Sequence, residues 1–324
     1  MSIRNWVWVR RLRRRWAAGA SRLFFACVVL MAIAALLVLP FPHPFDGRLI
    51  KAMETAAHFP LFAAGFFAWS LLVQPRRNWP ALRLLLVGVA LVAIAFELLQ
   101  ALTGRDPDAL DALFSSLGGW AAVLWWYSTH TYHRLLALGA RAMALLMGLA
   151  VGVPSSLIVA DRIYARASFP LLASFEGRSE VGRWWEDECD ISRVEQQATH
   201  GRYALRVALA KSPRSYPGLF MSDLPRDWTG YRQLCFDLYL TGGSERALWI
   251  RADDQPGYPP YGDRAQTLIS LSPGPNSICL DLASFLATPS GRPLDRAQIM
   301  RWGMFFEAPL GGESFFLDHV RLVR

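Results

Sequence analysis

Long apolar runs dominate the first half of this 324-residue chain and constrain its fold more than any other feature. A helix needs roughly 20 residues to cross a hydrocarbon core about 30 Å thick. Five runs reach or approach that length: 23–39, 59–73, 81–102, 112–127 and 142–160. The second and fourth runs are short, so tilting or neighbouring helices must supply the missing length. We therefore predict a membrane all-α bundle of about five transmembrane helices within residues 23–165.

Charge is divided unevenly along the chain. Up to Pro170 there are 17 Lys and Arg residues but only seven Asp and Glu, whereas the remainder has 17 basic and 19 acidic residues. A basic, acid-poor, apolar segment followed by a nearly neutral one is typical of a membrane region joined to a soluble domain. The net charge of +8 is then explained by cations that flank membrane spans. The lipid bilayer is the expected partner, and no nucleic acid is expected.

The arginines of the short loops predict the orientation. Twelve Arg lie before the first run or in the second and fourth interhelical loops, against only Arg48, Lys51 and Arg105 on the opposite side. Positive loops stay in the cytoplasm, so residues 1–22 form a basic cytoplasmic tail and the C-terminal domain is extracytoplasmic. An even number of spans would reverse this. A multi-pass protein of a bacterial-type inner (plasma) membrane is the expected location.

The first run also has the form of a signal peptide, because basic residues precede it. However, the proline-rich segment 40–44 follows it where small residues would be needed for cleavage. We therefore expect an uncleaved anchor.

Polar residues gather near the ends of three of the runs. On the predicted topology these ends share the level of the outer leaflet. Ionisable groups at such depth are costly and are functional candidates, although an Arg–carboxylate network that only ties helix ends together explains them equally well. The candidate membrane polar cluster consists of His58, Glu97, Gln100, Arg105, Asp111 and Ser115.

The order and spacing of these residues resemble the VanZ-like family over residues 46–127. The motif is a His that opens one span, Glu-x-x-Gln that ends the next, then Arg, then Asp at the start of a small-residue-rich helix. The chain departs from the family at Glu54-Thr55, where an Asp-Lys pair is usual, and at Ser115, where an Asn is usual. The family is named for a protein associated with teicoplanin resistance and has no settled activity. The resemblance thus implies a cell-envelope role, with an antibiotic-resistance association and little chemistry.

The periodicity changes after Leu171. Short segments alternate apolar and polar residues with period two, as half-buried strands do, and clusters of Gly, Pro, Asn and Ser separate them. Many short strands in about 150 residues predict an all-β jelly-roll sandwich over residues 171–324. The expected strands begin at Leu205, Leu234, Leu248, Thr267, Ile278 and Phe315.

The order of motifs in this half resembles the galactose-binding-like jelly rolls, which include carbohydrate-binding modules, over residues 171–323. The resemblance implies sugar binding, or protein contacts as in some relatives, and a structural Ca²⁺, for which Glu176 and Asp318 are the candidate ligands. The motifs are Phe175-Glu-Gly177, Trp184-Trp185, Tyr231–Tyr239, Tyr261–Arg264, Pro273–Asn276, Gly291–Asp295 and Phe316–Leu322.

Sugar sites combine an aromatic platform with a few directed polar groups. One loop-rich stretch, residues 253–264, is rich in both kinds of side chain, and we expect Trp249 and Trp302 to fill the core instead. The stretch could equally be a solvated loop. The candidate ligand-binding residues are Trp184, Trp185, Asp253, Asp254, Tyr261, Asp263 and Arg264, with Tyr258 and Trp249 as further aromatics nearby.

Three cysteines, Cys189, Cys235 and Cys279, fall in the domain predicted to lie outside, where an oxidising compartment permits a disulfide. An odd number leaves at least one free, and the strand alternation favours Cys235 with Cys279. Cys27 in the first run is expected to fill apolar space.

No known catalytic motif is present, so catalysis is not the favoured activity. The favoured function is a VanZ-like envelope protein whose outer domain recognises an envelope glycan or glycan-linked lipid. The alternatives are an enzyme or transporter acting on a lipid-linked precursor at the outer leaflet, and a protein-interaction scaffold.

Overall fold

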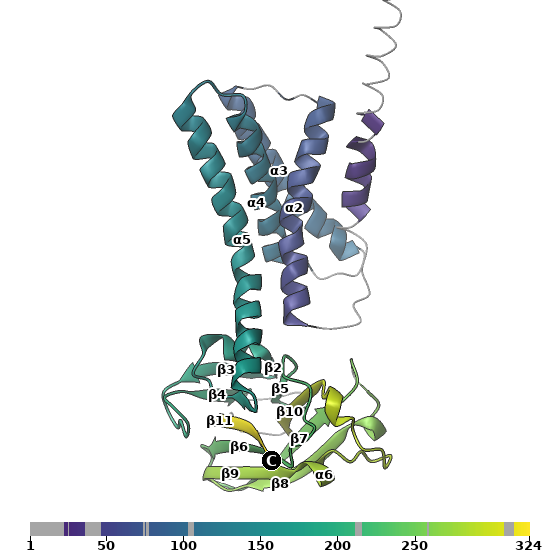
Figure 1. Ribbon diagram of the computed structural model, residues 1–324, viewed down its shortest axis with the longest axis vertical. Helices are drawn as coiled ribbons and strands as arrows, with labels where there is room; N and C mark the ends of the chain where they lie inside the picture. The colour runs from purple at the N-terminus through teal and green to yellow at the C-terminus, as the bar shows by residue number, and fades with distance from the viewer. Residues whose placement is uncertain are drawn as a thin grey trace, which may run out of the picture. The chain divides into compact units, whose positions relative to one another are not determined.

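The computed structural model describes residues 23–24, 26–35, 47–73, 75, 78–102, 107–210, 216–257, 259–307 and 314–324. The chain divides into two compact units. The helical unit comprises Met1–His43 and Lys51–Ser156, and the β unit comprises Pro44–Ile50 and Leu157–Arg324. Both units are drawn in Figure 1, and each is described by itself.

Four of the described helices of the first half are longer than the apolar runs that predict them. A short apolar helix covers Ala26–Ala35, and four longer ones follow: α2 (Arg48–Val73), α3 (Trp79–Leu102), α4 (Ala109–Ser128) and α5 (Arg134–Ser168). The apolar run 59–73 covers only part of the second helix, because α2 begins 11 residues before it. Residues 48–58 are rich in good helix formers such as Ala, Leu, Met and Lys, which hydropathy alone does not detect.

Three of the described helices, α2, α3 and α5, are long and apolar enough to cross a membrane. The prediction of five spans goes further than this. Helix α4 has 20 residues but is not among the three, and only residues 23–24 and 26–35 of the first run are described.

Helix α4 is the most buried of the helices in the described part of the unit. Buried residues along it include Ser115, Ser116, Gly118 and Gly119. A Cβ atom on Gly118 would lie 2.1 Å from the carbonyl oxygen of Phe59 in α2, and one on Gly119 would lie 2.3 Å from Val89 in α3. Small residues thus let α4 approach both neighbours closely, and its many buried residues fit a helix that faces protein.

The β unit is a sandwich of two antiparallel sheets (Figure 1). One sheet has the order β3-β4-β11-β6-β9, with β1 paired to β11, and the other has the order β2-β5-β10-β7-β8. Its elements are β1 (Leu171–Ala173), η1 (Arg178–Arg183), β2 (Trp184–Asp187), β3 (Cys189–Val194), β4 (Ala204–Leu209), β5 (Gly218–Met221), β6 (Gln233–Leu240), β7 (Arg246–Asp253), η2 (Tyr261–Asp263), β8 (Ala265–Leu271), β9 (Gly274–Asp281), α6 (Leu282–Phe285), η3 (Arg296–Gln298), β10 (Arg301–Phe306) and β11 (Ser314–Val323).

Period-two alternation sends one set of side chains from each sheet into a shared core. Trp228 and Trp302 are fully buried there, and Phe236 packs beside Trp302 with ring centroids 5.9 Å apart. The expectation that Trp302 fills the core is therefore confirmed. The other faces of both sheets remain available for polar and aromatic side chains.

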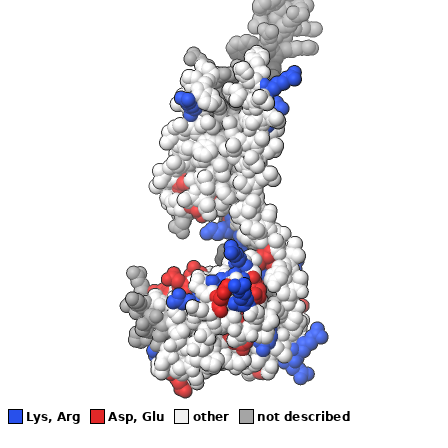
Figure 2. Space-filling model, turned by 90° about the vertical axis from the view of Figure 1, so that its left-hand side faces the viewer, with Lys and Arg blue, Asp and Glu red and all other residues white. Residues whose placement is uncertain are grey.

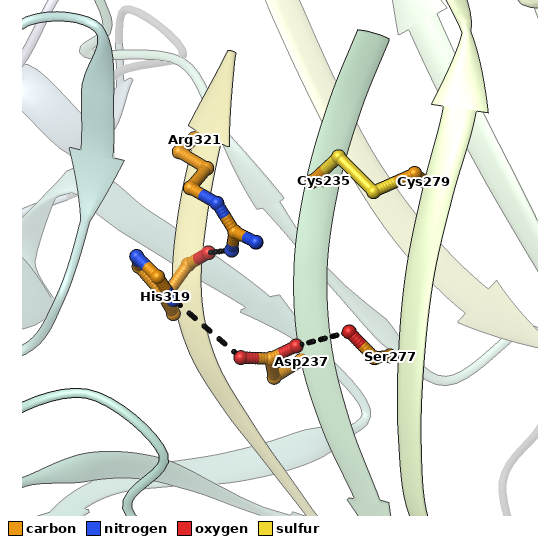
Figure 3. Close-up of a disulfide and its surroundings, with 6 residues drawn as sticks. All are labelled: Cys235, Asp237, Ser277, Cys279, His319 and Arg321. Carbon is orange, nitrogen blue, oxygen red and sulfur yellow. Dashed lines mark hydrogen bonds and ion pairs between the residues drawn. A yellow bond between two sulfur atoms is a disulfide. The ribbon is translucent and has the colours of Figure 1, made fainter. Parts of the chain in front are cut away.

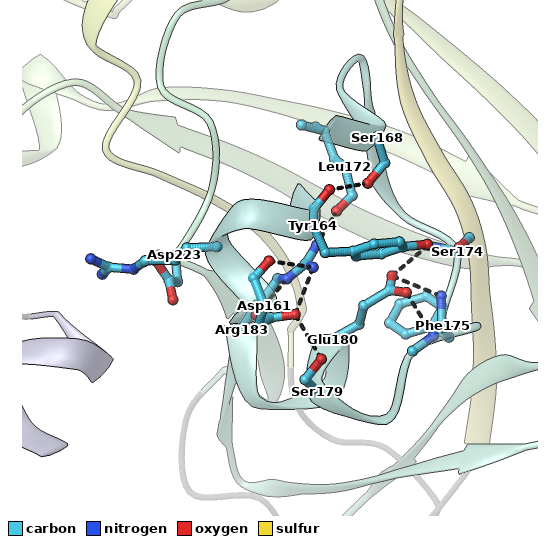
Figure 4. Close-up of polar contacts among 12 residues, drawn as sticks. Asp161, Tyr164, Ser168, Leu172, Ser174, Phe175, Ser179, Glu180, Arg183 and Asp223 are labelled. Atoms are coloured by element: carbon cyan, nitrogen blue, oxygen red, sulfur yellow. Dashed lines mark hydrogen bonds and ion pairs between the residues drawn. The ribbon is translucent and has the colours of Figure 1, made fainter. Parts of the chain in front are cut away.

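The last turns of α5 are joined to the sandwich by a buried ion pair within the β unit (Figure 4). The Arg183 guanidinium donates to both carboxylate oxygens of Asp161, at 3.0 and 2.8 Å, and to the carbonyl oxygen of Leu172. The Glu180 carboxylate in turn accepts the backbone N–H groups of Ser174 and Phe175. The helix end, η1 and β1 are consequently held as one hydrogen-bonded unit.

A disulfide joins Cys235 of β6 to Cys279 of β9, as the strand alternation suggested (Figure 3). The two residues are directly opposite each other in the register of the sheet. On the same sheet, Asp237 accepts a hydrogen bond from Ser277, and one of its carboxylate oxygens lies 3.6 Å from His319 Nδ1. The described cysteines without a disulfide are Cys27 and the buried Cys189.

We predict that replacing both Cys235 and Cys279 with Ser lowers the free energy of unfolding of the β unit by about 3–4 kcal/mol. The disulfide closes a loop over a sequence separation of 44, and such a loop restricts the unfolded chain by roughly that amount. Denaturant unfolding of the purified full chain measures the change, with Cys27→Ser as the matched control. Equal stability of the double variant and the control would contradict the prediction.

Candidate functional site

Four aromatic side chains form a continuous platform on the outward face of the sheet β2-β5-β10-β7-β8. We call this the aromatic face; its rings are Trp185, Phe220, Phe305 and Trp249. Trp185 stacks on Phe220 with centroids 4.7 Å apart, Phe220 on Phe305 at 6.3 Å, and Trp249 on Phe305 at 6.3 Å. Each ring comes from a different strand, so the platform runs across the sheet.

Two glycines provide the space that this platform needs. Gly303 of β10 is directly opposite Phe220, and Gly218 of β5 is directly opposite Phe305. A Cβ atom on Gly303 would lie 2.4 Å from the Phe220 ring, and one on Gly218 would lie 2.7 Å from Cβ of Phe305. A larger residue at either position would overlap the backbone of the paired strand and the aromatic residue opposite, so the platform depends on these two glycines.

Charged groups frame the rings. The guanidinium of Arg251 lies 5.9 Å from the Phe220 ring and is held by two hydrogen bonds to the buried carboxylate of Asp253, at 3.1 and 2.7 Å. Arg301 lies at the same distance over Trp185. The indole N–H of Trp249 donates to the Glu307 carboxylate at 2.9 Å. The rings thus form an apolar floor with directed donors and acceptors around it.

The aromatic face is hollowed rather than flat. It forms a depression of about 420 Å³ that also includes Tyr216, Tyr261, Arg264, Gln266 and Asp187. Tyr216 and Tyr261 at its rim are 55% and 63% exposed. A concave surface with an aromatic floor and a few convergent polar groups is the usual form of a small-molecule site.

The structure distributes the predicted ligand-binding residues over four environments. Trp185, Tyr261 and Arg264 line the depression. Trp184 is only 4% exposed and packs against Trp302 in the core, so it cannot face a ligand. Asp253 is fully buried behind Arg251.

The other two predicted carboxylates, Asp254 and Asp263, belong to a neighbouring ion-pair group. Both interact with the guanidinium of Arg292, which donates two hydrogen bonds to Asp254 at 2.6 and 3.0 Å. The further aromatic Tyr258 lies outside the described residues.

The assignment of Trp249 to the core was wrong, and this correction has a simple cause. Leu248 and Ile250 on either side of it are fully buried, so Trp249 must point to the opposite face of β7. Phe220, Phe305 and Arg251 were not predicted as site residues from the sequence. The strands of Phe220 and Phe305, β5 and β10, contain glycine, whereas Arg251 lies on a strand that was expected. Nothing local shows that residues 185, 220, 249 and 305 meet.

The two candidate Ca²⁺ ligands do not fit a calcium site. One Glu176 oxygen accepts the backbone N–H groups of Arg202 and Tyr203. One Asp318 oxygen accepts those of Thr199 and His200. A cation at either oxygen would meet these N–H dipoles at their positive ends. The carboxylates instead hold the loop between β3 and β4.

Most members of the membrane polar cluster that the structure describes come together in the helical unit. His58 Nδ1 lies 3.0 Å from Ser115 Oγ, and His58 Nε2 lies 3.5 Å from an Asp111 oxygen. Glu97 Oε1 is 4.0 Å from His58 Nδ1. Gln100, one turn further along α3 than Glu97, is also buried. Arg105 lies outside the described residues.

The chain matches no protein-family model and no curated protein. Among solved structures, it is similar to an exo-beta-agarase, at 17% identity with a TM-score of 0.39, over 47% of this chain but only 24% of that one.

It is also similar to a family 11 carbohydrate-binding module of Clostridium thermocellum in complex with a β-1,3-1,4-mixed-linked tetrasaccharide, at 22% identity with a TM-score of 0.36, over 47% of this chain and 94% of that one. A family 30 carbohydrate-binding module of Clostridium thermocellum matches at 13% identity with a TM-score of 0.33, over 44% of this chain and 91% of that one.

The Asp254–Arg292 pair beside the aromatic face gives a pH-dependent contribution to stability. Burial raises the pKa of the Asp254 carboxyl, but hydrogen bonds from Arg292 and from the Asp295 amide outweigh it, so the pKa lies below its ordinary value. The unfolded chain therefore binds this proton at higher pH than the folded chain does. The stabilisation is complete above the ordinary carboxyl pKa of about 4 and is lost as the pH falls through the lower, folded value.

We predict that Asp254→Asn lowers the free energy of unfolding at pH 7 by about 1–3 kcal/mol, the range for a buried hydrogen-bonded group, and that this loss shrinks below pH 4. Thermal unfolding of the full chain between pH 7 and pH 3 measures both effects. Asp190→Asn, at an exposed position of β3, is the control. If Asp254→Asn lowers the free energy of unfolding by the same amount at every pH, the Asp254–Arg292 pair does not make this pH-dependent contribution.

Proposed function

We propose that the β unit binds carbohydrate at the aromatic face and that the helices anchor it in a membrane. The observation that carries the first part is the row of four stacked rings in a hollow framed by charged side chains. Sugar rings present an apolar C–H face and a periphery of hydroxyls. Aromatic rings match the first, and Arg, Glu, Asp and Gln side chains match the second.

The distribution of exposed apolar residues supports this site. Among the described residues, the only exposed large apolar or tyrosine side chains of the sandwich are Tyr216, Tyr261 and Leu268. The first two line the depression, and Leu268 is directly opposite Trp249 in the sheet. The remaining surface of the sandwich offers a ligand little apolar area, so the aromatic face stands out as its binding surface.

The arrangement favours an extended ligand. The four rings cross four strands in sequence, and Tyr216 and Tyr261 add aromatic area at the rim. A platform of this form can contact several consecutive sugar units. A glycan chain or a glycan-linked lipid of the cell envelope is therefore the ligand class we propose.

Membrane anchoring is supported by the surface of the helices. All other exposed large apolar side chains in the described part of the chain lie between Leu23 and Tyr164, most of them in the helical unit. Figure 2 accordingly draws this unit with few charged residues along its length. Such a continuous apolar surface is unstable in water but suits lipid. The proposal includes up to five spans, with α4 as the interior helix.

The orientation and the family resemblance are parts of the same proposal. The arginine bias favours a cytoplasmic N-terminus, and a disulfide in the β unit favours an oxidising compartment for that unit. The VanZ-like resemblance is supported by the order of its motif residues and by the proximity of His58, Glu97, Asp111 and Ser115.

We predict that Trp249→Ala weakens binding of an oligosaccharide that the unaltered chain binds by about ten- to hundred-fold. Removing a central aromatic contact costs about 1.4–2.8 kcal/mol of binding free energy. The full chain in detergent is tested by calorimetric titration against a panel of envelope and plant oligosaccharides that includes a mixed-linked β-glucan tetrasaccharide. Phe305→Ala should have a similar effect.

The matched control is Tyr239→Ala, which removes a half-buried aromatic residue from the outward face of the other sheet. Its affinity should equal that of the unaltered chain. If every oligosaccharide fails to bind, or if Tyr239→Ala and Trp249→Ala lose the same affinity, the proposed site is wrong. If the chain binds another envelope protein and no oligosaccharide, the alternative function as a protein-interaction scaffold is favoured.

We predict that alkaline phosphatase fused after Arg324 is active in bacterial cells, because the β unit emerges on the outer side. A fusion after His130, in the loop between α4 and α5, should be inactive, since that loop is expected in the cytoplasm. Enzyme activity normalised to fusion abundance is the measurement. The opposite pattern would reverse the orientation.

A further inference from the structure

A second cluster of chemically competent side chains lies in the helical unit, apart from the aromatic face. His58 of α2, Glu97 of α3 and Asp111 of α4 offer an imidazole nitrogen and two carboxylate oxygens that all lie within 4.8 Å of one another. All three residues are buried, at 4%, 5% and 9% exposed. Three separate helices therefore converge on one point, where water has little access.

The hydrogen bonds around His58 favour one ring nitrogen as a ligand. When Nδ1–H donates to Ser115 Oγ, at 3.0 Å, Nε2 carries a lone pair and faces an Asp111 oxygen at 3.5 Å. Two electron-rich atoms at this separation repel each other unless a proton or a cation lies between them. A histidine that donates its other N–H to a neighbour is also the usual arrangement for a metal ligand.

Asp111 supplies an independent indication. Its second carboxylate oxygen, Oδ1, is buried and has no hydrogen-bond partner among the described residues. A buried carboxylate oxygen without a partner costs considerable free energy. The oxygen that faces His58 Nε2 is Oδ2. A cation bound by the carboxylate would offset the cost of burying Oδ1, whichever of the two oxygens coordinates it.

Close packing fixes the framework of the cluster. Gly118 follows Asp111 by two helical turns and Ser115 by nearly one, so all three share one face of α4. Gly118 contacts the backbone of Phe59, the neighbour of His58, so closely that a Cβ atom would overlap it. This contact holds the donor groups of α2 and α4 at a fixed separation.

We propose that His58, Glu97 and Asp111 bind one divalent transition-metal ion, with Zn²⁺ as the first candidate. Zn²⁺ takes imidazole and carboxylate ligands at about 2.0–2.2 Å, which places donor atoms of a tetrahedral site roughly 3.4 Å apart. The 3.5 Å separation of His58 Nε2 and the Asp111 oxygen matches that value, and small side-chain rotations close the wider separations. Three protein ligands leave one coordination position open, as in catalytic zinc sites.

The test uses the full chain purified in detergent without a histidine tag. The protein is stripped with a chelator, reloaded separately with Zn²⁺, Mn²⁺ or Co²⁺, desalted and analysed by mass spectrometry for bound metal. One Zn²⁺ per chain is expected, and the Co²⁺ form should show visible d–d bands without a thiolate charge-transfer band. Less than one tenth of an ion per chain for every metal would overturn the proposal.

Variants locate the ion. His58→Gln and Asp111→Asn should each weaken Zn²⁺ binding at least ten-fold, whereas His133→Gln, at an exposed position outside the helices, should bind like the unaltered chain. Ser115→Ala tests the orienting hydrogen bond and should weaken binding about ten-fold with normal helix content. If Asp111→Asn and His58→Gln fold and still bind one ion at full affinity, the site lies elsewhere and the proposal fails.

If those two variants do not fold, the decision rests on Ser115→Ala. Loss of affinity with normal helix content supports the site, and unchanged affinity overturns it.

Discussion

The aromatic face depends on two positions without side chains, Gly218 and Gly303. In an antiparallel sheet, residues directly opposite each other share one face and compete for the same space. Glycine at one member of each pair gives the space to Phe220 and Phe305, which complete the row between Trp185 and Trp249. A Cβ atom at either position would overlap the backbone of the paired strand and the aromatic residue opposite. The concave platform, its charged frame and the proposed recognition of sugars all follow from this absence of Cβ atoms.

The same alternation that builds the core determines which residues can meet a ligand. On β7, the odd-numbered residues Trp249, Arg251 and Asp253 share the outward face, while Leu248 and Ile250 are buried in the core. Asp253 has no contact with the depression, yet it fixes the guanidinium of Arg251 against the rings. The polar frame is therefore preorganised, which reduces the entropy that binding would otherwise cost.

Local patterns in the sequence predicted much of the fold but only part of the site. Six strands of the sandwich and the Cys235–Cys279 disulfide follow from period-two alternation, and the core position of Trp302 was also expected. Helix lengths were underestimated at Arg48–His58, where propensity rather than hydropathy extends α2. The predicted site lacked Phe220 and Phe305. Their strands, β5 and β10, pair through residues more than 80 positions apart in the chain. No local signal in the sequence encodes such a pairing.

In the helical unit, by contrast, the sequence identified the polar site residues but not the packing that positions them. There the polar residues could be identified in the sequence because each interrupts an apolar run, and helical periodicity placed Glu97 and Gln100 on one face. What the sequence could not give is the contact of Gly118 with Phe59, which sets the separation of α2 and α4. Packing of backbones, rather than the polar groups themselves, determines the geometry of that cluster.

The most direct test of the central claim is a structure of the chain with a bound oligosaccharide from the panel. The account predicts sugar density stacked on Trp249 and Phe305, with hydroxyl groups within hydrogen-bond distance of Arg251. Density on the outward face of the other sheet, beside Tyr239 and Asp237, would contradict it.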